Sequence, residues 1–167
     1  QKYYEGKVPE LGVLTPEDEN VLAEMKAIPE RISKLVYAYK LRDAQAEAMN
    51  LARLGNKYLA ENEPWKLIKT DEERVKTIMN IAIQITANLS IVLQPFLPAT
   101  AKKLSAFLKF VNKDWTNAGK SDLIPSGHLT DTPTILFQKI EDSLVEAELA
   151  RLEASKAANV ADVKVEL

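Results

Sequence analysis

Apolar residues recur at three- and four-residue spacing along most of the chain, which is the pattern of amphipathic helices. Three long runs show this pattern, and they predict helices over residues 15–39, 41–62 and 72–93. Thr15 should cap the first helix, because Pro16 fits a first turn and the acidic residues that follow complement the helix dipole. Pro29 lies inside the first run, where we expect a kink rather than a break.

Two shorter helices complete the pattern, over residues 98–110 and 141–156. The third long helix is apolar around so much of its circumference that it should lie at the centre of a bundle. Periodicity fades over residues 111–133 and turn residues gather there, so this stretch should be a loop that Trp115 anchors. We therefore expect an all-α bundle (residues 1–110), a loop-rich return segment with a C-terminal helix (111–156) and a mobile tail (157–167).

A helix break that carries a tryptophan separates the second and third long runs. Pro64 cannot continue the preceding helix and fits the first position of a new turn, which places Trp65 at a helix start. An aromatic plane, free backbone N–H groups and nearby cations such as Lys66 and Lys69 suit an unstacked base and its phosphate. A Pro-Trp pair after a helix is also typical of a core anchor, and the spacing alone favours that interpretation.

Composition narrows the class of protein. The chain has 167 residues, of which 46% are hydrophobic, and this suits one compact domain. No apolar run approaches the length of a membrane span, so none is expected. The absence of Cys excludes disulfides and agrees with a reducing cytoplasm. The net charge of −2 is not that of a general nucleic-acid binder, but residues 31–76 hold 10 basic and 7 acidic side chains. The positive excess thus falls on the segment that carries Trp65.

Candidate catalytic groups are missing from the sequence. The single histidine, His128, follows Gly127 in a loop, where a lone histidine is far more often structural than catalytic. Carboxylates are abundant, but no spacing picks out an acid–base pair or a set of metal ligands. We therefore expect no catalytic residue, no metal ligand and no cofactor in this chain.

Several motifs occur together in the order seen in one known family. Asn56-x-Tyr58 followed by Pro64-Trp65-x-Leu67-x-Lys69 resembles the anticodon-binding domain of methionyl-tRNA synthetase. The similarity covers the chain from about Tyr3 to Arg151. It continues in Leu93-Gln94-Pro95-Phe96-Leu97-Pro98, in Leu123-Ile124-Pro125-Ser126-Gly127-His128-Leu129 and in Leu136-Phe137-x-Lys139-Ile140-Glu141.

This resemblance implies a fold and a binding site. The fold is the helical bundle of the anticodon-binding type found in class I aminoacyl-tRNA synthetases. A tryptophan at the position of Trp65 stacks on the first anticodon base in that family, with Pro64 beside it, and Asn56 is a candidate polar contact. The candidates for phosphate contacts are Lys57, Lys66 and Lys69, although a solvated helix face is the commoner reason for lysines at such positions.

The resemblance also implies partners. The ligand would be the CAU anticodon of methionine tRNA, in support of ATP-dependent methionylation in the cytoplasm. The catalytic domain should be absent, because the chain lacks the family's His-Ile-Gly-His and Lys-Met-Ser-Lys-Ser strings. ATP and Mg would belong to that domain, and zinc is a further candidate there. In the family an Asn and an Arg on a helix just before Gln1 help to choose the base, and residues 123–141 return toward the catalytic domain.

Two alternatives remain open at this stage. The chain could be the anticodon domain of a sister synthetase for isoleucine, valine, leucine or cysteine, although the Pro64-Trp65 pair argues against it. It could also be a helical protein–protein interaction module in which Trp65 is a core residue. That module predicts a buried Trp65 and no tRNA binding, whereas base recognition predicts an accessible Trp65 and binding that weakens as salt rises.

Overall fold

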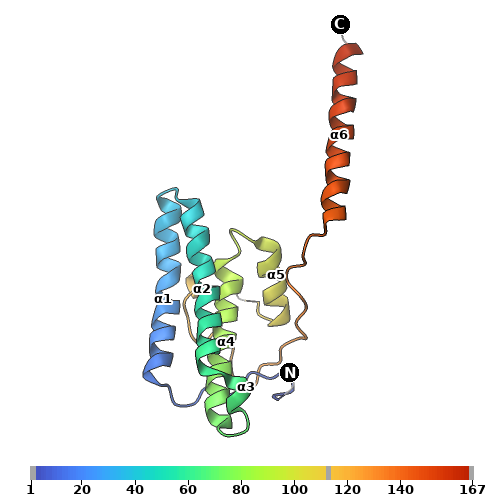
Figure 1. Ribbon diagram of the computed structural model, residues 1–167. Coiled ribbons are helices and arrows are strands. Elements are labelled where there is room, and N and C mark those ends of the chain that lie inside the picture. The colour runs from blue at the N-terminus through green and yellow to red at the C-terminus, as the bar shows by residue number, and fades with distance from the viewer. Residues whose placement is uncertain (1–2, 112–113, 166–167) are drawn as a thin grey trace. The chain divides into compact units, whose positions relative to one another are not determined.

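The computed structural model describes residues 3–111 and 114–165, and helices are the regular elements throughout those residues (Figure 1). The chain divides into two compact units, residues 1–134 and residues 135–167. The elements are α1 (Pro16–Tyr37), α2 (Leu41–Asn62), α3 (Pro64–Leu67), α4 (Glu72–Val92), α5 (Pro98–Phe107), the short 3-10 helix η1 (Trp115–Asn117) and α6 (Asp142–Val165). The expected all-α class is confirmed.

The helices α1 and α2 form an antiparallel hairpin whose start is set by a capping box. The Thr15 side chain accepts a hydrogen bond from the Asp18 backbone N–H, and Asp18 accepts one from the Thr15 N–H at 2.9 Å. Two of the free donors at the helix start are thereby satisfied, as the sequence predicted for a Thr cap. α1 continues through Pro29 and is not split. Val36 is exposed because the helix ends one residue later.

The helix α4 lies at the centre of the bundle and packs against α1, α2, α3 and α5. Small residues on α2, Gly55 among them, let α2 and α4 approach closely. A Cβ placed on Gly55 would lie 3.1 Å from Cγ2 of Ile85 on α4, so close packing explains this glycine.

By length and composition alone, α4 is apolar enough to cross a membrane. The expectation that the chain holds no apolar run of that length is therefore wrong. Of the apolar stretch of α4 that has this character, 67% is buried inside the protein. The core helix of a bundle has the same character, so this feature is explained by packing within the protein.

A row of buried polar side chains on α4 holds two irregular segments against the bundle. Asn80, Gln84 and Asn88 are four residues apart and therefore share one face of the helix. Each side chain bonds to backbone groups of another segment, so these segments bury their polar groups without a sheet. The bonds are Asn80 Nδ2 to Pro9 O (2.8 Å), Gln84 Nε2 to Ile124 O (2.7 Å), Ile124 N to Gln84 Oε1 (3.1 Å), Asn88 Nδ2 to Lys120 O (2.8 Å) and Gly119 N to Asn88 Oδ1 (2.6 Å).

Other contacts fix the loop and the N-terminal segment. The Val8 N–H donates to His128 O at 2.9 Å, and His128 Nε2 donates to the Leu108 carbonyl at 2.7 Å. His128 is thus structural, as expected for a lone loop histidine. Trp115 Nε1 donates to Ser33 Oγ on α1 at 3.1 Å, which confirms that this tryptophan anchors the loop.

Some boundaries differ from those that the sequence predicted. α5 ends at Phe107 rather than at residue 110, and Lys109 then takes a left-handed backbone with φ of 48°. α6 extends to Val165 rather than to residue 156, so the expected tail is helical as far as the structure describes it. Residues 166–167 of that tail lie outside the described residues. The loop up to residue 134 belongs to the same unit as the bundle, whereas residues 135–141 belong to the second unit.

Candidate nucleic-acid interface

The turn that presents Trp65 is built around Glu63. This residue ends α2 and begins α3 with a left-handed backbone, φ 43° and ψ 54°. Its N–H donates to Leu59 O at 3.0 Å, and its carbonyl accepts from the Lys66 N–H at 2.8 Å. Pro64 stands at the first position of α3, as predicted, because it needs no N–H partner there. The backbone on both sides of Trp65 is therefore held by hydrogen bonds.

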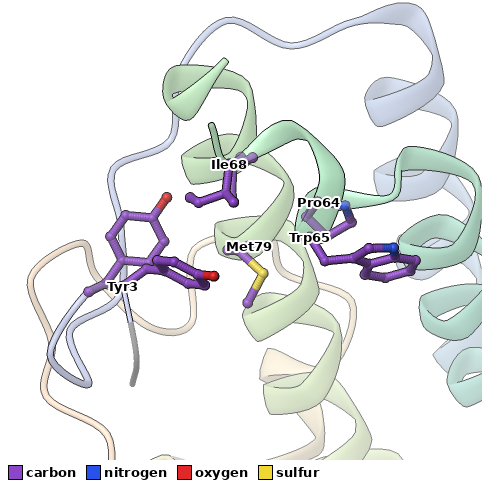
Figure 2. A pocket seen from close by; sticks show the side chains of 7 residues that line it. Tyr3, Pro64, Trp65, Ile68 and Met79 are labelled. Carbon is purple, nitrogen blue, oxygen red and sulfur yellow. The ribbon is translucent and has the colours of Figure 1, made fainter. Parts of the chain in front are cut away.

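Trp65 projects from this turn beside an apolar cavity. Pro64 is buried, but Trp65 is 58% exposed, so the interpretation of Trp65 as a core residue is wrong. Figure 2 shows Pro64 and Trp65 on one side of the cavity, Tyr3 on the other and Met79 between them. The cavity has a volume of about 230 Å³ and is lined by Tyr3, Tyr4, Pro64, Trp65, Ile68, Val75 and Met79.

A buried polar cluster lies at the base of the turn and joins α1, the end of α2 and the start of α4. Asp18 is fully buried and forms an ion pair with Arg74, whose Nη2 lies 3.0 Å from Asp18 Oδ1. The Tyr58 hydroxyl donates to the same carboxylate. Arg74 Nη2 also donates to Asn62 Oδ1 at 2.7 Å, at the last residue of α2. The cluster therefore clamps the two helices that flank α3.

The environment of Asp18 favours its charged form. Burial by itself raises the pKa of Asp18, but hydrogen bonds from Arg74, Thr15 and Tyr58 outweigh burial and lower the pKa from 3.8 to about 2. Burial and the neighbouring Asp18 carboxylate raise the pKa of Tyr58, so its hydroxyl remains a donor.

The lowered pKa predicts a loss of stability in acid. Asp18 stabilises the folded state above its unfolded pKa, and this stabilisation should disappear as pH falls from about 4 to about 2. The loss attributable to Asp18 should be about 2 kcal/mol. Urea unfolding of wild type and Asp18→Asn across this range measures it. The difference in unfolding free energy between the two proteins should shrink toward pH 2, and a constant difference would contradict the assignment.

The other predicted site residues lie apart from the cavity. Asn56 is exposed on α2, seven residues before Glu63, which corresponds to about 10 Å along the helix. Lys57 lies 3.8 Å from Glu61 and lines a different groove, between α1 and α2. Lys66 pairs with Glu63 at 2.7 Å, and Lys69 has no ion pair within the residues that the structure describes. Of the six candidates, only Pro64 and Trp65 line the cavity.

The sequence interpretation did not assign Tyr3 and Tyr4 to the site, although both lie in the segment that carried the resemblance. The Tyr4 hydroxyl is buried and has no hydrogen-bond partner among the described residues. Burial, with a further contribution from Glu72, raises the pKa of Tyr4, so the hydroxyl stays protonated. An aromatic pair near the start of the chain was the only signal that could have suggested this wall.

The chemistry of this site is that of binding. The walls are aromatic and aliphatic, and the buried charged groups nearby, Asp18 and Arg74, are paired with each other. Within residues 3–111 and 114–165 no group of three or more His, Asp or Glu side chains could hold a metal ion. A planar, partly apolar group is the kind of ligand that fits beside Trp65.

Solved structures show which class of fold this bundle belongs to. It resembles the apo form of Mycobacterium tuberculosis methionyl-tRNA synthetase with a TM-score of 0.71, over 81% of this chain and 28% of that chain. The same enzyme bound by methionyl-adenylate gives a TM-score of 0.70. The sequence identity is 21% in both comparisons, so these matches establish the fold alone, a helical bundle like the one in that enzyme.

Sequence relatives show the family. The family model described as the anticodon binding domain of methionyl tRNA ligase matches residues 8–157, and the chain belongs to this family. It is 51% identical over 159 residues to the methionine–tRNA ligase of Bacteroides fragilis, covering 95% of this chain and 23% of that protein. The corresponding ligase of Christiangramia forsetii is 53% identical over 165 residues, covering 95% and 24%. The chain thus spans about a quarter of the length of these relatives, and the resemblance found in the sequence is confirmed.

Proposed function

We propose that the chain binds the anticodon arm of methionine tRNA and that Trp65 stacks on the first base of the CAU anticodon. The observation that carries this proposal is the half-exposed indole, held beside an apolar cavity on a turn whose backbone is hydrogen-bonded on both sides. An exposed aromatic side chain offers a stacking surface to a base. Such a stack contributes about 1–3 kcal/mol per base.

Choice of the base requires polar groups, because stacking accepts any base. Tyr4 lines the cavity, and its buried hydroxyl has no partner among the described residues, so a small movement of this side chain would let it bond to the polar edge of a base beside Trp65. Asn56 lies about 10 Å away along α2 and suits a neighbouring nucleotide better than the same base. We assign Tyr4 the closer contact and Asn56 the more distant one.

The phosphates of the same loop would be held by the nearby lysines. Lys69 is free of ion pairs in the described part of the chain, so it can bind a phosphate without losing a partner. Lys66 and Lys57 would exchange exposed glutamate partners for phosphate. Exposed ion pairs of this kind contribute only about 0–1 kcal/mol, so the exchange costs little.

The reaction itself would take place outside this chain. In a full-length ligase of this family, we place methionine activation with ATP and Mg in the remaining three quarters of the protein, in the cytoplasm, where zinc is a further candidate. The second unit offers a contact surface for the rest of the ligase, because several of its apolar side chains are exposed. These side chains are Ile135, Phe137, Ile140, Leu144, Val145, Leu149 and Leu152.

Trp65→Ala tests the proposal. In the full-length ligase that carries this domain, the affinity for methionine tRNA should fall about 5- to 150-fold, which corresponds to one lost stack. Filter binding or fluorescence anisotropy at fixed salt measures this, and circular dichroism should be unchanged because Trp65 is half exposed.

Val13→Ala is a matched control, since Val13 is 92% exposed and lies in the segment before α1. Its affinity for the tRNA should stay within about twofold of wild type. An unchanged affinity in Trp65→Ala would exclude the stacking role.

A further inference from the structure

The turn between α1 and α2 carries a second exposed aromatic and basic surface. Tyr37 is 85% exposed and Tyr39 is 91% exposed, and Leu41 beside them is 59% exposed. Lys40 and Arg42 are also exposed, and neither has an ion pair within the described residues. These five residues are called the turn patch below.

Two hydrogen bonds hold the backbone of the turn, and Tyr39 stands at a position where glycine is usual. Lys40 N–H donates to Leu35 O at 2.9 Å and Tyr39 N–H donates to Val36 O at 2.9 Å, which is the hydrogen-bond pattern of a Schellman motif. Tyr39 occupies the left-handed position of that motif with φ of 59°. A tyrosine at this position is strained, and its ring, 91% exposed, gains almost no packing in return. Packing therefore gives no reason for a tyrosine at this position, and its exposed ring is open to a ligand.

The charges of the turn identify the kind of ligand. Along residues 34–44 there are three basic residues and one acidic residue, Asp43. Lys34 Nζ forms an ion pair with Glu30 Oε1 at 2.7 Å, so Lys40 and Arg42 are the cations available to a ligand. Cations bind the phosphates of nucleic acid, and hydroxyl groups such as those of tyrosine bond to phosphate and sugar oxygens.

The turn patch is far from the anticodon site. α2 has 22 residues and connects the two sites, so they are about 33 Å apart along the helix. Figure 1 shows the α1–α2 turn and α3 at opposite ends of the same bundle. We propose that the turn patch binds the sugar–phosphate backbone of the same tRNA outside its anticodon arm. This inference rests on the proposed function, because it takes the tRNA as the ligand.

The double variant Lys40→Glu/Arg42→Glu tests the inference in the full-length ligase. Its affinity for whole methionine tRNA should fall roughly tenfold, and the slope of log affinity against log salt should become shallower by about two. Its affinity for an isolated anticodon stem–loop should remain that of wild type. The matched control is Lys102→Glu/Lys103→Glu on α5, where two adjacent exposed lysines are changed by the same charge and the effect should be below twofold.

A third variant separates RNA contact from folding. Tyr39→Gly relieves the left-handed strain, so the midpoint of thermal unfolding should rise by about 2 °C while the affinity for whole tRNA falls. Equal affinities for the charge-reversed variant and its control would overturn the inference while leaving the anticodon site intact. Equal losses for whole tRNA and for the stem–loop would also overturn it. A change in domain stability with unaltered tRNA binding would overturn it too, because it would indicate a structural role for the turn. Wild-type protein that fails to bind either RNA would overturn the proposed function itself.

Discussion

Replacement of Arg74 by Met should lower the free energy of unfolding by about 3–5 kcal/mol, because it leaves a buried carboxylate without its cation. Asp18 is 0% exposed, and the remaining donors, Thr15 and Tyr58, do not carry a charge that could balance it. The loss of Arg74 also removes the bond to Asn62 at the end of α2. Urea denaturation followed by circular dichroism measures the effect.

Two further variants identify the cause of that loss. Arg53→Met replaces an exposed arginine on α2 and should change stability by less than about 0.5 kcal/mol. The double variant Asp18→Asn/Arg74→Met should be more stable than Arg74→Met alone, because no unpaired charge remains in the core. If the unfolding free energy of Arg74→Met lay within about 1 kcal/mol of the wild-type value, the ion pair would not clamp α1 to α4.

Replacement of Gln84 by Leu should cost about 2–6 kcal/mol of unfolding free energy. The amide of Gln84 bonds to both the N–H and the carbonyl of Ile124, and its loss leaves two buried backbone groups without partners. Each orphaned group costs about 1–3 kcal/mol. Urea denaturation measures the total, and hydrogen exchange at the Ile124 amide reports the local loss.

Gln45→Leu provides the control for this change, since Gln45 is exposed on α2 and the substitution is chemically the same. It should be neutral within about 0.5 kcal/mol. If Gln84→Leu were equally neutral, the loop around Ile124 would be held by its apolar contacts alone and the polar row on α4 would have no part in its stability.

Local patterns were sufficient to predict most of the helices and the turn at Pro64. A helix is formed by residues that are neighbours in sequence, so apolar spacing and caps such as Thr15 fix its position within a few residues. The proline at position 64 prevents continuation of α2 whatever surrounds it. The errors lie at helix ends: α5 is shorter than expected and α6 is longer.

Long-range partners could not be predicted in the same way. Asn80 bonds to Pro9 across 71 positions, and Arg74 pairs with Asp18 across 56 positions. Along the sequence these side chains resemble ordinary polar residues on a helix, because nothing local records which segment will pack against them. The central position of α4 followed from its apolar stripe, but the polar row within that stripe did not.

The candidate site was predicted in part for the same reason. Pro64 and Trp65 are adjacent in sequence and define their own turn, so their placement could be derived locally. The wall formed by Tyr3 and Tyr4 is more than 50 positions away from Trp65 by residue number and meets it only through the fold. The lysines were chosen by proximity in sequence, and helix geometry directs Lys57 to another groove.

The most direct test of the account is a double-mutant cycle between Trp65 and the first anticodon base. Affinities of wild type and Trp65→Ala ligase would be measured for cognate methionine tRNA and for a tRNA in which that base is abasic. Stacking predicts that Trp65→Ala weakens cognate binding by about 1–3 kcal/mol and has almost no further effect on the abasic tRNA. Equal losses for the two tRNAs would show that Trp65 does not contact this base and would contradict the central claim.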